Sequence, residues 1–386
     1  MGSFVLVGAL VVAVAGGVRG HVVEPTNDVT GEHSLDDTEL VLAFVVFRHG
    51  DRTPDQEELD LYSGSENYSD IFYPYGKKAL TNKGKQRGYL VGEYLRSRYD
   101  GLISKLYLSD DIVIRTTDYA RTKMTALTAL AALYPPLPAQ KWNPALDWQP
   151  IPYNTIAPKL DDLLYWYWCP RYLWLRDQIY EYPEMKALIK PYEKLFSYMS
   201  EHTGRNITKP EDVFYLDNLF QTLENVGIPP PQWAVDVMPD IREMTKIEYA
   251  AEFFVPELRK LASGVLLNEV LNVSATVLSG NKDQPKLWLY SAHENNVAAL
   301  MSAARVFEAH QPSYGSTFSL ELRRHRSTGD YGFTAVYARS AGGPAEILPI
   351  QGCQNQLFCE YGTFVSLTRD TVLSLADYKK QCPIME

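Results

Sequence analysis

The sequence predicts an α/β fold: a Rossmann-like, mostly parallel sheet flanked by helices, with an α-helical cap domain inserted into it. Short apolar runs of strand length occur at 41–47, 111–115 and 286–291. Each run ends in charged or polar residues and is followed by apolar residues at helical spacing. Between the second and third runs, 161–278 shows helical patterns and no convincing strand. This order is typical of a sheet interrupted by a helical insertion.

The first run, 41–47, is β-branched and apolar, which indicates a buried strand. It leads directly into Arg48, His49, Asp51 and Arg52. Guanidinium groups bind phosphate bidentately, and an imidazole nitrogen beside a bound phosphate can attack phosphorus. The alternative is an ordinary polar loop in which Asp51 pairs with one of the two arginines.

Two further predicted strands end at polar side chains that can bind or react with a ligand. The second run ends on Arg115 and precedes a helical pattern, and the third is followed by His293 and Glu294. Ligands of open α/β sheets bind beyond the carboxyl ends of the strands, so we expect these side chains to gather around His49. A lone histidine is more often an unremarkable polar residue, but two at equivalent strand ends favour a functional site.

The remaining elements follow from local patterns. Thr81 can cap a helix that runs to about Arg98. The stretches 316–323 and 332–338 alternate apolar and polar residues, which predicts two late strands at an antiparallel edge.

These patterns predict the domain boundaries. An apolar run near the N-terminus is too short to span a membrane comfortably and indicates a signal peptide over 1–20. We expect 38–150 and 285–382 to form the α/β core and 151–284 to form the mainly helical cap. No second hydrophobic span is apparent, so we expect a protein that is secreted or lumenal and has no membrane anchor.

Composition limits the partners. The chain has 386 residues, a formal charge of -10 and a pI near 5.3, which argues against a general nucleic-acid binder. An anion site must therefore be a local cluster of positively charged side chains in an otherwise acidic protein.

Secretion also bears on the cysteines and the sequons. Four cysteines in an oxidising compartment indicate two disulfides, and the sequence allows three pairings. In one of these pairings, a bond between Cys353 and Cys359 closes a small loop. The second bond, between Cys169 and Cys382, ties the end of the chain to its middle. The candidate glycosylation sites are Asn67, Asn206 and Asn272.

The motifs resemble those of a known family. The strings RHGDRTP at 48–54, IRTTDYARTKM at 114–124 and SAHENN at 291–296 resemble signatures of the histidine acid phosphatases, in branch 2 of the histidine phosphatase superfamily. CPRY at 169–172 and the Cys353 and Cys359 pair are similar to the prostatic and lysosomal type, and HENN to insect venom-type members.

The resemblance implies roles for particular residues. His49 would be the nucleophile and Glu294 the proton donor. The phosphate ligands it implies are Arg48, Arg52, Arg115 and His293. It implies no metal or cofactor, and it implies that a homodimer can form. Two departures are that the family usually has Asp at the position of Glu294 and that prostatic-type members have six such cysteines.

The expected function is a secreted or lumenal acid phosphatase that hydrolyses small phosphomonoesters or phosphorylated proteins through a phosphohistidine intermediate. Because a protonated carboxyl group must donate to the leaving alcohol, we expect an acidic pH optimum. The alternative from another class is a secreted protein that binds a phosphorylated ligand and has lost turnover through the change to Glu294. A phosphotransferase is a further alternative, which the apparent secretion disfavours.

Overall fold

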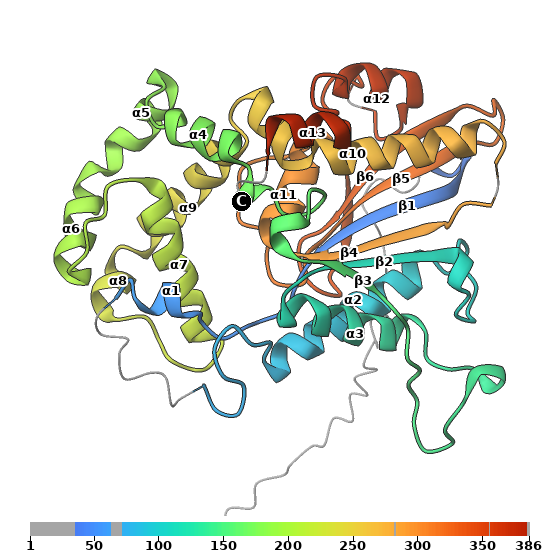
Figure 1. Cartoon of the computed structure of the whole chain (residues 1–386), viewed down its shortest axis with the longest axis horizontal. Coiled ribbons are helices and arrows are strands. Elements are labelled where there is room, and N and C mark those ends of the chain that lie inside the picture. The colour runs from blue at the N-terminus through green and yellow to red at the C-terminus, as the bar shows by residue number, and fades with distance from the viewer. Residues whose placement is uncertain (1–34, 63–71, 282, 355, 384–386) are drawn as a thin grey trace, which may run out of the picture.

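The computed structural model describes residues 35–62, 72–281, 283–354 and 356–383. Within them one eight-stranded sheet has the order β3-β2-β4-β1-β5-β6-β7, and β8 pairs with β6. Helices cover both faces of the sheet, and a group of helices stands beside the ends of the strands (Figure 1). The strands are β1 (Thr38–Arg48), β2 (Ile112–Thr117), β3 (Asn154–Ile156), β4 (Leu287–Ala292), β5 (Thr317–His325), β6 (Tyr331–Ala338), β7 (Ala345–Leu348) and β8 (Cys359–Glu360).

The sheet has a parallel half and an antiparallel half. Strands β3, β2, β4 and β1 run parallel, and Arg48 at the end of β1 is paired with Ala292 at the end of β4. Strands β5, β6, β7 and β8 continue the sheet in antiparallel pairs. The α/β class is confirmed, and the two late strands lie where they were predicted, but parallel pairing holds for one half of the sheet only.

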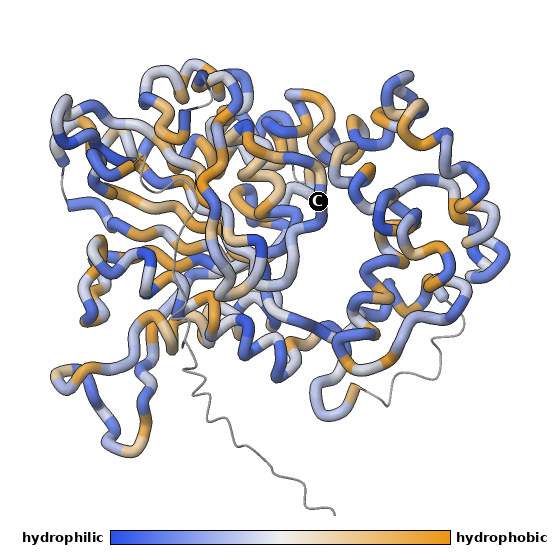
Figure 2. The backbone as a smooth tube through the Cα atoms, turned by 180° about the vertical axis from the view of Figure 1, so that it is seen from behind, coloured by the Kyte–Doolittle hydropathy of each residue, from blue (hydrophilic) through white to orange (hydrophobic). Residues whose placement is uncertain are grey.

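Apolar side chains on alternate sides of β1 explain the layers. Ala43, Val45 and Phe47 are buried against one layer of helices, whereas Phe44 and Val46 are buried against the other. Figure 2 shows hydrophobic stretches along the strands, and alternating hydrophobic and hydrophilic stretches in the helices beside them. The flanking helices are α2 (Asn82–Arg98) and α3 (Ala120–Leu133) on one face, and α10 (Pro256–Leu278), α11 (Glu294–Ala303), α12 (Tyr361–Thr368) and α13 (Leu375–Gln381) on the other.

A second hydrophobic core lies in the cap. Leu59 of α1 and Phe72 also join this core, so a segment directly after the first strand belongs to the cap as well. The cap contains α1 (Gln56–Leu59), α4 (Pro170–Ile179), α5 (Pro183–Ile189), α6 (Glu193–Thr203), α7 (Pro210–Glu224), α8 (Gln232–Asp236) and α9 (Met238–Glu252). Short 3₁₀ turns are η3 (Ser109–Asp111), η4 (Pro138–Gln140), η5 (Pro158–Leu160), η6 (Trp166–Trp168) and η7 (Lys190–Tyr192).

Both ends of the segment expected to form the cap lie in the sheet layer instead. Strand β3 pairs with β2, and α10 packs Leu266, Leu267 and Val270 against the strands. Among the described helices, α10 is the one whose length and composition would suit a membrane span, and more than half of its most apolar window is buried in the fold. Its hydrophobicity is that of a core helix that packs against α11.

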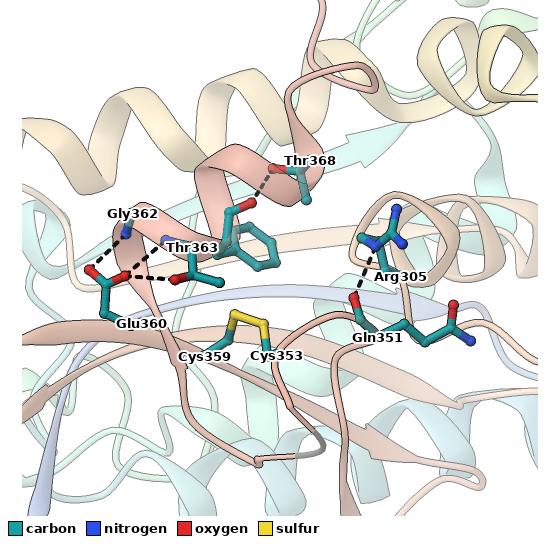
Figure 3. The surroundings of a disulfide bond; sticks show 9 residues. Arg305, Gln351, Cys353, Cys359, Glu360, Gly362, Thr363 and Thr368 are labelled. Atoms are coloured by element: carbon teal, nitrogen blue, oxygen red, sulfur yellow. Dashed lines mark hydrogen bonds between the residues drawn. A yellow bond between two sulfur atoms is a disulfide. The ribbon is translucent and has the colours of Figure 1, made fainter.

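The structure contains two disulfides. Cys169, at the start of α4, is bonded to Cys382 at the end of α13 and joins cap to core across 213 positions of sequence. Cys353 and Cys359 close a short loop before α12 (Figure 3). In the same view Glu360 caps α12 by accepting from the amides of Gly362 and Thr363.

The predicted modification and targeting segments fall on different parts of the chain. The proposed signal peptide over 1–20 and the sequon at Asn67 lie outside the described residues. Asn206, before α7, and Asn272, on α10, are both exposed. Their glycosylation stays a prediction.

Candidate active site

Parallel pairing of β1 with β4 brings the two histidines together. The backbone amide of His49 donates to the carbonyl of Ala292 at 3.0 Å, and His293 is the next residue along the chain. The two imidazole rings meet edge to face with their centroids 5.5 Å apart. His49 is 1% exposed, so its ring lies in a protected position at the edge of the sheet.

Hydrogen bonding orients the His49 ring. Its Nδ1 lies 2.8 Å from the carbonyl oxygen of Gly50, which can only accept, so Nδ1 carries the proton. The opposite atom, Nε2, then has a lone pair and accepts from Nε of Arg121 at 3.1 Å. This arrangement is the one that a nucleophilic imidazole requires.

His293 is held by two threonines. Its Nε2 lies 3.0 Å from Oγ1 of Thr117, which in turn donates to Oγ1 of Thr122. Because Thr122 Oγ1 donates onward to the carbonyl of Thr117, Nε2 of His293 is the donor to Thr117. The Nδ1 atom of His293 is 3.5 Å from Nη2 of Arg121.

Arg48 and Glu294 form a buried ion pair beside His49. Nε of Arg48 lies 2.9 Å from Oε2 of Glu294, and that oxygen is 4.0 Å from Nε2 of His49. Arg48 also donates to the carbonyl of Pro312 at 2.7 Å and stacks 3.9 Å from the centre of the Tyr314 ring. Glu294 is the first residue of α11, where the helix dipole favours a carboxylate.

Arg52 lies in the same electrostatic field, but its two Nη atoms bind Glu58. They donate to Oε2 and Oε1 at 2.7 and 2.5 Å. Glu58 also accepts from the backbone of Asp55 in a capping box at the start of α1. A carboxylate from the cap side therefore fixes the orientation of Arg52.

The prediction that Arg115 lies beside His49 is wrong, and Arg121 lies there instead. Strand β2 extends two residues beyond Arg115, to Thr117, so Arg115 stays within the sheet and its Nη2 binds Asp161 at 2.5 Å. The chain then turns into α3, which places Arg121 in the first turn, between the two histidines. The segment 114–124 contains both arginines, and the length of the strand decides between them.

Burial and positive neighbours set the ionisation of this group. The pKa values of His49 and His293 lie well below 6.5 because both rings are removed from most of the solvent and face Arg121, so both are neutral. Burial alone would raise the pKa of Glu294, but the Arg48 and Arg52 guanidiniums hold it below its usual value. In the free protein Glu294 is therefore a carboxylate at mildly acidic pH.

The same residues have spacing that would suit a metal ion. Ligand atoms of His49, His293 and Glu294 lie within 4.8 Å of one another, in the part of the chain that the structure describes. Arg48 already binds the carboxylate, and Arg121 donates to the imidazole nitrogen. Because these guanidiniums repel a cation and attract an anion, the donor set suits phosphate better than a divalent metal.

A cleft adjoins the charged group. Arg48 and Tyr314 line a cavity of about 510 Å³ between core and cap, whose wall also includes Arg87, Arg242 and Lys246. The cap therefore does contribute cations beside the site, although Arg242 is paired with Asp217 at 2.8 Å. The cleft offers room for the part of a ligand that extends beyond its phosphate.

Comparison with known proteins decides the family. The model of the histidine phosphatase superfamily (branch 2) matches residues 39–336. The chain belongs to this family. Among its relatives, venom acid phosphatase Acph-1 of Apis mellifera is 32% identical over 339 residues, covering 87% of this chain and 86% of that protein. The prostatic acid phosphatase of Homo sapiens is 33% identical over 316 residues, covering 78% of both.

Solved structures agree on the fold of this histidine phosphatase. The phytase of Klebsiella sp. ASR1 superposes with a TM-score of 0.64 at 14% identity, covering 88% of this chain and 97% of that one. At that identity the likeness concerns the fold alone. It extends to the central sheet flanked by helices.

Proposed function

We propose that this histidine phosphatase is a secreted or lumenal acid phosphatase that hydrolyses phosphomonoesters through a phosphohistidine at His49. The observation that carries the proposal is the state of the His49 ring. Its Nε2 atom is unprotonated, 3.1 Å from the Arg121 guanidinium and 4.0 Å from the Glu294 carboxylate. A nucleophile, an anion-binding group and an acid–base group therefore surround one point.

Positive groups on three sides would hold the substrate phosphate. Arg48 and Arg121 are placed to donate to its oxygens, and His293, which lies beside Arg121, would do so once its Nδ1 carries a proton. Arg52 adds charge while Glu58 restrains it. The cleft beside Arg48 would take the alcohol portion of a small phosphomonoester or a phosphorylated protein.

The chemistry follows in two displacements. Nε2 of His49 attacks phosphorus, the bond from phosphorus to the ester oxygen breaks, and Glu294 gives its proton to that oxygen. In the second step Glu294, now a carboxylate, takes a proton from water. The water oxygen attacks phosphorus, the bond from phosphorus to Nε2 breaks, and inorganic phosphate leaves.

The ion pair between Arg48 and Glu294 controls when Glu294 is protonated and can act as the general acid. In the free protein Glu294 is ionised, because Arg48 lowers its pKa. A bound phosphate competes for Arg48 and adds negative charge beside the carboxyl group, and both effects raise the pKa of Glu294. Substrate binding and low pH together would therefore supply the protonated acid.

Secretion is supported by three features. The apolar segment within 1–20 has the length of a signal peptide, and the structure contains two disulfides. The relatives include a protein named for venom and another named prostatic acid phosphatase.

Trapping the intermediate tests the nucleophile. The wild-type protein, mixed with labelled aryl phosphate and quenched in alkali, should retain the label on the chain. His49→Ala should retain none, whereas His202→Ala, which changes an exposed histidine in the cap, should label as the wild type does. Label retained by His49→Ala would disprove the assignment.

The proton donor is tested by the leaving group. Glu294→Gln should lose little activity on an aryl phosphate whose phenol is acidic, because that oxygen leaves without a proton. On an alkyl phosphate it should lose about 10²-fold to 10⁴-fold, the usual contribution of general acid catalysis. Equal losses on both substrates would show that Glu294 acts in another way.

One observation favours the alternative of a binding protein without turnover. The close pairing of Glu294 with Arg48 opposes protonation of the carboxyl group. In that case the wild type would bind phosphate without hydrolysing any ester. Glu294→Asp, which withdraws the carboxyl group from Arg48 by about one bond length, would then gain activity.

A further inference from the structure

A buried polar cluster joins the cap to the helix that carries Glu294. Its members are Glu252 at the end of α9, Tyr167 in η6 and Asn295 in α11. The hydroxyl of Tyr167 donates to Oε1 of Glu252 at 3.1 Å. The side-chain amide of Asn295 donates to Tyr167 and, at 3.3 Å, to the same oxygen of Glu252.

Asn295 directly follows Glu294, so the cluster acts next to the reacting carboxyl group. The other end of the Asn295 amide, Oδ1, accepts from the hydroxyl of Tyr249 at 3.0 Å. Both ends of this side chain are thus bound by cap residues. The first turn of α11 is therefore fixed against the cap by contacts that include Glu252.

Glu252 is a carboxyl group that the proposed reaction does not use. It is 2% exposed, and its Oε2 atom is buried without a hydrogen-bond partner. An unpartnered oxygen of this kind disfavours the charged form, and burial raises the pKa of Glu252 to about 7.

The charged neighbours do not neutralise Glu252. Arg176 of α4 lowers its pKa, but the two Nη atoms of Arg176 already bind Glu211 and Glu248. Glu294 and Glu211 both act to raise it. The titratable and charged groups that interact with Glu252 are Tyr167 from η6, Tyr172 and Arg176 from α4, Tyr180 directly after α4, Glu211 and Tyr215 from α7, Tyr249 from its own helix, and Glu294 from α11.

We propose that Glu252 is a positioning residue whose charge sets the upper pH limit of anion binding at the catalytic site. Neutral Glu252 leaves the field of the arginines undiminished. Ionised Glu252 places a second buried negative charge behind Glu294 and repels a dianion at the phosphate position. The inference rests on the proposed phosphatase site and assigns a pH control to it.

Sulfate binding isolates this titration, because sulfate keeps its charge across the range and is not turned over. Calorimetry on the full chain from about pH 6 to about pH 9 should show the dissociation constant for sulfate rising by about threefold to tenfold, with a midpoint near that of Glu252. Because His49 and His293 stay neutral in this range, they do not contribute to the rise. Glu252→Gln should show no such rise.

Glu269→Gln is the matched control. Glu269 of α10 is a half-buried carboxyl group that, like Glu252, accepts from a tyrosine, here Tyr290 at 2.6 Å, but no hydrogen bond within the described residues joins it to Asn295. This variant should keep the wild-type rise. The same rise in Glu252→Gln as in the wild type overturns the proposal.

A second variant covers the case in which Glu252→Gln fails to fold. Tyr167→Phe removes the hydroxyl that stabilises ionised Glu252, so the midpoint should move to higher pH. A midpoint that does not move counts against Glu252 as the titrating group. Failure of the phosphatase proposal is seen separately, as absent ester hydrolysis in a wild-type protein that still binds sulfate.

Discussion

At His49, burial and then the neighbouring charges decide which form of the imidazole is present. Arg121 lies within hydrogen-bonding distance, and His293, Arg48 and Arg52 add to its effect. A depressed pKa means that the protonated form is reached only well below 6.5. The proposed nucleophile therefore remains available in acid, where an ordinary histidine would be charged.

This ionisation predicts the pH dependence of the first step. With an aryl phosphate that needs no proton donor, the rate of phosphohistidine formation should stay constant as the pH falls through 6.5 to about 5. Rapid quenching of labelled substrate would measure it. A loss of half the rate near pH 6.5 would show that His49 titrates as a free imidazole does.

The two arginines of 114–124 differ in role. Arg121 → Ala should lower kcat/KM by about 10²-fold to 10³-fold, because a guanidinium beside the transferred phosphate is lost. Arg121→Lys should recover part of the loss. Steady-state kinetics with one substrate are sufficient for this comparison.

Arg115→Ala is the matched control. It should leave kcat/KM within about threefold of the wild type, while chemical unfolding shows a loss of about 1–3 kcal/mol because buried Asp161 loses its partner. A loss of activity in Arg115→Ala equal to that in Arg121→Ala would restore Arg115 as a phosphate ligand.

At the scale of elements, the first turn of α11 determines where Glu294 lies. Asn296 closes this turn: its Oδ1 accepts from the backbone amide of His293 at 3.1 Å. Its amide nitrogen donates to the carbonyl of Leu164 at 2.7 Å. One side chain thus caps the helix and ties it to the segment that precedes the cap.

Asn296→Ala should therefore reduce both stability and turnover. We expect a loss of about 1–3 kcal/mol in the free energy of unfolding, because two buried hydrogen bonds disappear, and a lower kcat with a smaller change in KM. Ser374→Ala, which removes the cap of α13 far from the site, should cost about 1 kcal/mol and leave kcat unchanged. Unchanged kcat in Asn296→Ala would mean that the capping contacts do not place Glu294.

At the scale of the whole molecule, the cap and the core meet at the proposed catalytic site, and the disulfide between Cys169 and Cys382 joins them. Cross-linking of distant positions removes much entropy from the unfolded chain. For a separation of 213 residues the loop-entropy model gives about 5 kcal/mol, against about 2 kcal/mol for the separation of 6 between Cys353 and Cys359.

Replacing each disulfide by a pair of alanines tests this difference. Loss of the Cys169 pair should lower the midpoint of chemical unfolding more than loss of the Cys353 pair does. It should also raise KM, since the cap forms one wall of the cleft beside Arg48. Equal effects on stability from both replacements would show that the tether adds nothing beyond local packing.

The sequence by itself determined the two strand ends that lead into His49 and His293, and the motifs around His49, His293 and Glu294. Alternation of apolar residues sets which face of a strand is buried, and charged residues at the end of a buried strand must lie at the sheet edge. Both constraints are local. They hold in the apolar segment 41–47, which leads directly into Arg48 and His49.

Only the tertiary structure decided between Arg115 and Arg121, because β2 gains two residues by pairing with β3 and β4, and that pairing depends on strands far away in sequence. The same reason moved β3 and α10 from the expected cap into the sheet layer. The contact between Glu252 and Asn295 likewise joins residues 43 positions apart. Local pattern fixes the elements, whereas packing between distant segments fixes which charges meet.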